Sequence, residues 1–198
     1  CGTPGTGGDA ITVSIPTLRI QGSALHTGIS GDGASQIGVT GYSSTCNGGE
    51  GGRTAGILSD LLTLQEVTIL AETRPGQSLG GLSSEPVTAS PQGPQTFENG
   101  KGGILEGIQA GGDSTLEQAS LQVRGESGTL REITGITLVD GTLNRTDVRL
   151  DTSAYAEGVR IEGSATMTNS LIHHVLYPGV AVHGSGEGAL LSSNTVVC

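Results

Sequence analysis

The 198-residue chain is long enough to bury one hydrophobic core, so it fits a single domain that needs no stabilising disulfides or metals. Thirty-five glycines, 34% apolar residues, one Phe, three Tyr and no Trp indicate frequent turns and aliphatic packing, and they disfavour long helices. A formal net charge of −10 without a basic stripe argues against nucleic acid as a partner. Because no apolar run approaches ~20 residues, the sequence predicts no membrane-spanning helix.

The chain opens with a glycine-rich stretch, and residues 1–10 are predicted to form a flexible tether. Cys1 followed by Gly-Thr-Pro-Gly resembles the mature start of bacterial lipoproteins, in which the cysteine is acylated after signal cleavage. That resemblance implies a lipid anchor at Cys1, and a fragment boundary fits the same residues equally well. Cys46 and Cys198 could pair in an oxidising compartment, but the sequence does not place their sulfur atoms within bonding reach.

Short strands are predicted in the first part of the chain, where apolar and polar residues alternate and each run ends at Gly or Pro. They cover residues 11–15, 17–20 and 36–40. Residues 56–71 are ambiguous, because Leu58 and Leu61 fit one face of a helix whereas Leu64 and Ile69 belong to strand-like runs. We expect a short capping helix there, followed by a strand.

Residues 75–103 are rich in Pro, Gly and Ser and are predicted to form a long irregular loop. Four prolines interrupt any regular hydrogen-bonded ladder in this stretch: Pro75, Pro86, Pro91 and Pro94.

From Ser114 onward the chain repeats. Three units open at spacings of 27 and 24 residues, and a partial fourth follows 23 residues later: Thr115-Leu116, Thr142-Leu143, Thr166-Met167 and Ala189-Leu190. A second strand recurs inside each unit, as Ile136-Thr137-Leu138, Val159-Arg160-Ile161 and Val180-Ala181-Val182. A period in the low twenties with two or three short strands is typical of one coil of a solenoid, because a single coil cannot bury its own apolar face.

Asparagines recur as well, at intervals of 25 residues: Asn144, Asn169 and Asn194. Stacked asparagines can hydrogen-bond from coil to coil and tolerate the left-handed backbone of sharp corners, so we expect an asparagine ladder.

These repeats resemble the right-handed parallel β-helix repeat family, with its pectin-lyase-like architecture. The resemblance rests on residues 158–163 with 169–172, and on residues 179–184 with 194–197. It is clear over 114–198 and weak over 11–74. It implies an all-β chain with one right-handed parallel β-helix domain over 11–198, and it implies little about function because this architecture hosts many activities.

A charged row is predicted on the strand that covers residues 146–151. If Val148 and Leu150 point inward, then Asp147, Arg149 and Asp151 share the outer face. Such a row can bind an acidic or hydroxylated polysaccharide, with the carboxylates as Ca²⁺ ligands or as an acid and base pair. It can equally be a solvated face whose opposite charges pair with one another.

Neighbouring coils add to this row. The strand repeat turns His173 outward, whereas the asparagine ladder turns His174 outward, so one histidine reaches the row in either register. Arg124 in the preceding coil is expected to stack near Asp151. A separate pair, Glu162 and His183, is expected on an outer column of the second sheet.

Two functions follow as hypotheses. The first is a non-catalytic structural, adhesive or ligand-binding module of a secreted or surface-anchored protein, with a polysaccharide or another protein as partner, the latter at an open sheet edge. The alternative is a carbohydrate-active enzyme, a lyase, hydrolase or epimerase, acting on acidic polysaccharide. Resemblance to such enzymes would require Gly-His-Gly or Arg-Ile-Lys signatures, which are absent, so no catalytic residue is assigned and Ca²⁺ is the sole cofactor considered.

Overall fold

The computed structural model describes residues 10–26, 36–37, 45–47, 50–72, 83–84, 96–98, 102–125, 130–152, 155–175, 178–183 and 188–197. Within these ranges the chain is all-β, and the pairings between its strands are parallel, as predicted. No helix in this part of the chain is long and apolar enough to cross a membrane. Cys1, Cys198 and nearly all of the predicted tether lie outside the described residues.

The strands follow one another closely along the chain. In the first half they are β1 (Ala10–Ser14), β2 (Thr17–Gln21), β3 (Ala24–His26), β4 (Gln36–Ile37), β5 (Thr45–Asn47), β6 (Arg53–Ser59), β7 (Leu61–Gln65), β8 (Thr68–Glu72), β9 (Ser83–Ser84) and β10 (Thr96–Glu98). In the second half they are β11 (Gly103–Glu117), β12 (Ser120–Gly125), β13 (Leu130–Asn144), β14 (Asp147–Thr152), β15 (Glu157–Ile161), β16 (Ala165–Thr168), β17 (Leu171–His173), β18 (Val180–Val182), β19 (Leu190–Ser192) and β20 (Thr195–Val197).

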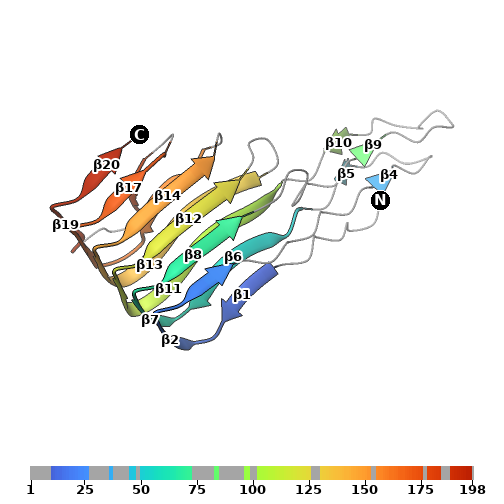
Figure 1. Ribbon diagram of the computed structural model, residues 1–198. Helices are drawn as coiled ribbons and strands as arrows, with labels where there is room; N and C mark the ends of the chain where they lie inside the picture. Colours follow the sequence, from blue (N-terminus) through green and yellow to red (C-terminus); the bar gives the residue numbers. More distant parts are fainter. Residues whose placement is uncertain are drawn as a thin grey trace, which may run out of the picture.

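Most strands belong to two sheets (Figure 1). Sheet A has an upstream arm, in the order β1-β6-β11-β13-β15-β18, and a downstream arm made by β2, β7, the second halves of β11 and β13, β16 and β19. Sheet B has the order β3-β8-β12-β14-β17-β20. Each passage of the chain adds one strand to sheet B and either two strands or one long strand to the two arms, which makes six layers: β1–β3, β6–β8, β11–β12, β13–β14, β15–β17 and β18–β20.

The strand repeat predicted from the sequence sets the register of these layers. Thr115 stands opposite Thr142, which stands opposite Thr166, and the Ile136, Val159 and Val180 strands align as predicted. The fourth unit was predicted one residue too early, because Leu190-Leu191 pairs with Thr166-Met167 in place of Ala189-Leu190.

The predicted capping helix in residues 56–71 is wrong, because this segment forms the strands β6, β7 and β8. Leu62, Leu64 and Ile69 are fully or almost fully buried, and they alternate with residues that face away from the core. Pairing with the layers on both sides supplies the hydrogen bonds, so tertiary structure overrides the leucine spacing that fits a helix.

The strands predicted at 11–15 and 17–20 are confirmed as β1 and β2. Of the strand predicted at 36–40, the described part is β4. The short strands β9 and β10 fall inside the segment predicted as a loop, most of which lies outside the described residues.

The predicted asparagine ladder is wrong as a column. Asn144 stands opposite Thr168, and Thr168 stands opposite Ser192, so the layer step is one residue shorter than the asparagine spacing. Asn169 alone among the three has a left-handed backbone, with φ 50°, at a corner that Gly22, Glu66, Gln118, Arg145 and Ser193 occupy in other layers. Contacts between layers remain, because Asn169 Nδ2 donates to Asn144 Oδ1 at 3.3 Å.

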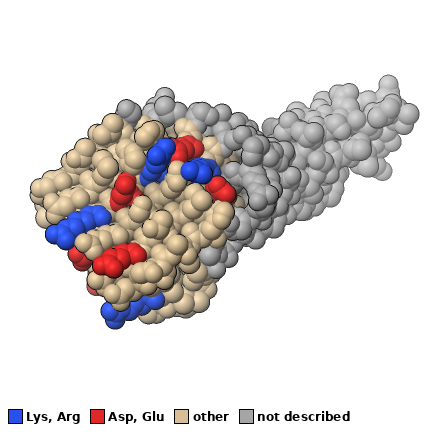
Figure 2. Space-filling view, viewed as in Figure 1, with Lys and Arg blue, Asp and Glu red and all other residues tan. Residues whose placement is uncertain are grey.

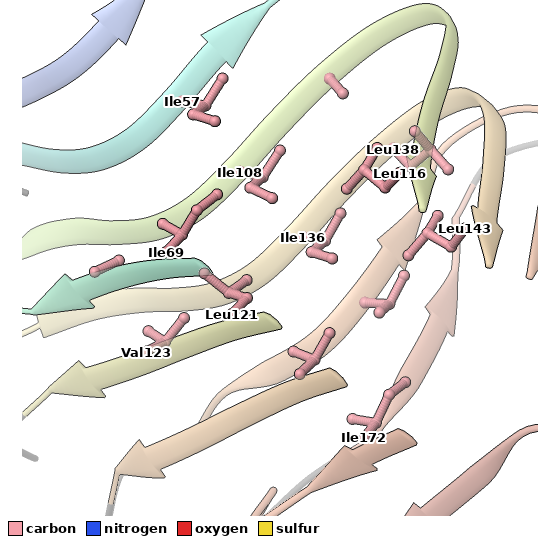
Figure 3. Close-up of a cluster of buried hydrophobic side chains, with 14 of the residues drawn as sticks. Ile57, Ile69, Ile108, Leu116, Leu121, Val123, Ile136, Leu138, Leu143 and Ile172 are labelled. Carbon is pink, nitrogen blue, oxygen red and sulfur yellow. The ribbon is translucent and has the colours of Figure 1, made fainter. Parts of the chain in front are cut away.

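The core lies between the two arms and sheet B (Figure 3). Its residues form columns from layer to layer, each member at most 1% exposed: Ile57, Ile108, Ile136 and Val159 in the upstream arm; Leu64, Leu116, Leu143 and Met167 in the downstream arm; Ile69, Leu121, Val148 and Ile172 in sheet B.

A column of glycines marks the closest approach of the upstream arm to sheet B: Gly56, Gly107, Gly135, Gly158 and Gly179. A Cβ atom on Gly135 would lie 2.4 Å from the carbonyl oxygen of Gly158 and 2.8 Å from Val148 Cγ1. No side chain fits there without separating the strands, so packing requires the glycine that recurs at this position of each layer.

Candidate functional site

The charged row predicted from the sequence lies on β14, on the side of sheet B that faces away from the core. Val148 and Leu150 are fully buried, while the side chains of Asp147 and Arg149 are 50% and 44% exposed, which confirms the predicted alternation. Asp151 accepts two hydrogen bonds from Arg149 Nε, at 2.8 and 3.0 Å. The guanidinium therefore pairs with a carboxylate of its own strand.

His173 joins the row, because β17 pairs with β14 so that His173 stands opposite Arg149. Its Nε2 lies 2.9 Å from Asp147 Oδ1, and its Nδ1 lies 2.9 Å from Nδ1 of the exposed His174. Of the two registers left open by the sequence, the one set by the strand repeat is correct.

Arg124 reaches the row from β12, as expected, with Nε 3.7 Å from Asp151 Oδ2. Its Nη1 lies 4.0 Å from Glu72 Oε2 on β8, and Glu72 Oε1 lies 2.9 Å from His26 Nε2 on β3. We call this chain of alternating charges, which crosses β3, β8, β12, β14 and β17, the sheet B row. Glu72 and His26 were not identified from the sequence, because the repeat was clear only after residue 114.

The carboxyl of Asp151 is held in its ionised form. Burial raises its pKa, but hydrogen bonds from Arg149 and Gln122 outweigh that effect and hold the pKa below the usual 3.8. The Gln122 amide donates to Asp151 Oδ2 at 2.6 Å. Asp151 is therefore suited to accept hydrogen bonds rather than to donate a proton, and a Ca²⁺ ion here would have to displace Arg149 from the same oxygens.

A second polar group, which we call the arm cluster, lies on the outer side of the upstream arm. The side chains of Glu106 and Glu157 are only 9% and 5% exposed, and Arg53 pairs with Glu106. Arg160 bridges two carboxylates, with Nε 2.6 Å from Glu157 Oε2 and Nη1 2.6 Å from Glu132 Oε1. A signal was present in the sequence, since Glu106 and Glu157 each directly precede a glycine of the repeated column.

Two buried threonines of β13 lie next to these charges. Thr134 stands between Glu106 and Glu157 in the register, and it is fully buried. Within the described part of the chain, the buried hydroxyls of Thr134 and Thr137 have no hydrogen-bond partner. In the arm cluster the charged side chains are therefore paired, whereas the two buried threonine hydroxyls have no hydrogen-bond partner among the described residues.

Glu162 and His183 follow the paired residues Ile161 and Val182, so they occupy one outer column as expected, but the ion pair of His183 is with a different carboxylate. His183 Nε2 lies 3.4 Å from Glu157 Oε1, so His183 belongs at the edge of the arm cluster. Glu162 is exposed.

Two shallow hollows lie near these groups. One of about 360 Å³ lies where the arms of sheet A meet, between β1, β6 and β11, and Asp60 and Gln109 are among its lining residues. The other, of about 270 Å³, is lined by Leu171, His173, His174 and Val197 at the end of the sheet B row. In Figure 2, acidic and basic side chains lie next to one another on the described part of the face in view.

In the ranges that the structure describes, no group of three or more His, Cys, Asp or Glu side chains is arranged to hold a metal ion. No protein-family model, curated protein or solved structure matches this chain.

Proposed function

We propose that this chain is a right-handed parallel β-helix that acts as a non-catalytic binding module of a secreted or surface-anchored protein, with a hydroxyl-rich polysaccharide as its ligand. Six layers in parallel register around one core support the architecture, since layers of this kind can bury their apolar faces only against one another. The handedness follows from the strong preference of parallel crossover connections for right-handed paths.

The sheet B row is the observation that carries the binding role. It crosses five strands, so at ~4.8 Å per strand it extends for roughly 19 Å perpendicular to them. Half-buried or exposed carboxylates, guanidiniums and imidazoles alternate along it, and this pattern offers donors and acceptors to sugar hydroxyls at a regular spacing. The net charge of −10 favours a neutral polymer over a polyanion.

A binding role fits the row better than catalysis does. Glycoside hydrolysis needs a carboxylic acid with a raised pKa, whereas the pKa of Asp151 is lowered. The alternative, a carbohydrate-active enzyme, is favoured by one observation in the arm cluster. Glu106 and Glu157 are nearly buried carboxylates on strands two steps apart, roughly 9.6 Å, with Thr134 between them.

Calorimetric titration with neutral and uronic-acid polysaccharides, with and without Ca²⁺, tests the proposal. We expect binding of a neutral polymer that is lost in Arg149→Gln and retained in the matched control Arg19→Gln, which removes an exposed charge from β2. Absence of binding to all of the polymers would overturn the proposal. Release of reducing or unsaturated ends that disappears in Glu157→Gln, or in Asp147→Ala and Asp151→Ala, would establish the enzyme instead.

A further inference from the structure

Apolar side chains in the last layer are exposed, although the residues at the corresponding positions of the preceding layer are buried. Val182, Leu191 and Val196 are 47%, 47% and 45% exposed. Their register partners one layer earlier, Ile161, Met167 and Ile172, are 0% exposed. The core columns therefore continue to an open face at β18, β19 and β20.

The first layer is open on the opposite side. Ile15 is 44% exposed, and Leu18, Ile20 and Leu25 are only partly buried against the core. Within the described residues, β1, β2 and β3 each pair with a strand on one side only, and so do β18, β19 and β20. Both ends thus combine apolar side chains with unpaired backbone groups, which is the combination that recruits further strands.

The two ends align in register, because three core columns run from the first layer to the last. The columns are Val13-Ile57-Ile108-Ile136-Val159-Val180, Ile20-Leu64-Leu116-Leu143-Met167-Leu191 and Leu25-Ile69-Leu121-Val148-Ile172-Val196. In each of these three columns, an apolar side chain at one end therefore matches the register of an apolar side chain at the other end.

We propose that copies of this chain associate head to tail, with β1, β2 and β3 of one copy adding to β18, β19 and β20 of the next as a seventh layer. In the register that the chain already uses, Ile20 covers Leu191 and Leu25 covers Val196. Backbone hydrogen bonds between the added strands and burial of both apolar faces stabilise the contact.

The charges of the described residues are compatible with this junction. The same register places Arg19 beside Leu190 and His26 beside Val197, so no like charges meet. Each copy carries a net charge of −10, which opposes association at a distance, so salt strengthens the contact by screening that repulsion. Because the contact joins two different ends, every complex keeps one open end on each side, and association continues beyond the dimer.

Sedimentation velocity of the 198-residue chain, from low micromolar to the highest soluble concentration, tests this inference independently of polysaccharide binding. We expect a concentration-dependent series of dimers and larger species for the unmodified chain. Val196→Asp places a charge on the open face of the last layer, and Ile15→Asp places one on the open face of the first layer. Each charge should prevent another copy from adding at that end, and each position is half exposed, so the free chain tolerates it. Each variant alone should be monomeric, with association weakened on the order of 100-fold or more.

Mixing the two variants provides the decisive comparison. Val196→Asp retains an intact first layer and Ile15→Asp retains an intact last layer, so the mixture should form dimers and nothing larger. Thr195→Asp, an exposed outward-facing position on β20, is the matched control and should associate like the unmodified chain. Circular dichroism verifies that each variant is folded. A monomeric unmodified chain, a mixture that stays monomeric, or dimers of Ile15→Asp alone would overturn the inference.

Discussion

The glycine column makes a strong prediction about packing, which Gly135→Ala tests. The added methyl would lie 2.4 Å from the Gly158 carbonyl oxygen, so the strands must separate by about 1 Å before the contact is ordinary. Overpacking of this kind costs ~1–3 kcal/mol, and two weakened ladder hydrogen bonds add about 1 kcal/mol each. Methyl burial and the lower entropy of the unfolded chain return ~1–2 kcal/mol. The net loss of stability should be about 2–3 kcal/mol.

Thermal unfolding followed by circular dichroism measures the effect, and the melting temperature should fall by roughly 5–10 °C for a chain of this size. Gly22→Asn is the control, because a Cβ atom at Gly22 would meet nothing within 4 Å. Its left-handed φ of 58° is one that Asn169 adopts at the same corner of a later layer, so the control should stay within about 1 kcal/mol of the unmodified chain. Gly135→Ala melting at or above the unmodified chain would refute the packing argument.

Three further predictions concern single groups. Because the pKa of Asp151 is lowered on folding, its carboxylate stabilises the fold above the unfolded pKa, and this contribution is lost as pH falls through the folded pKa. Between about pH 5 and pH 2, the denaturation midpoint should therefore fall more steeply for the unmodified chain than for Asp151→Asn, by an amount under ~1 kcal/mol, and equal slopes would contradict this. Thr134→Val replaces a buried hydroxyl that has no partner among the described residues, so urea denaturation should show a gain of about 1 kcal/mol, and a loss would mean that the hydroxyl is bonded. Asn169→Ala should cost about 1 kcal/mol in the same assay, whereas Asn169→Gly, which keeps the left-handed corner without strain, should cost at most half as much; equal losses would show that the corner is not the cause.

Buried aliphatic side chains were a better guide to strand register than polar side chains. In residues 114–198 an aliphatic side chain occupies the same core position in each successive layer. The predicted registers of Thr115, Thr142 and Ile136 are those observed. The asparagines do not have to be buried, so their spacing does not fix the register. Asn144 and Asn169 form a hydrogen bond between layers although they occupy different positions in their layers. A polar spacing of 25 residues was therefore a weaker guide to register than the apolar spacing of 24.

The amino-acid sequence alone determined the all-β class, the outward row of Asp147, Arg149 and Asp151, and the stacking of the last layers, because alternation within a strand and repetition between strands are local properties of the chain. Tertiary structure decided the features that depend on contacts with neighbouring layers. It made residues 56–71 strands, selected His173 over His174, and brought Glu106 and Glu157 into one cluster. Each of these outcomes depends on hydrogen bonds and charges supplied by strands distant in sequence, which no local pattern records.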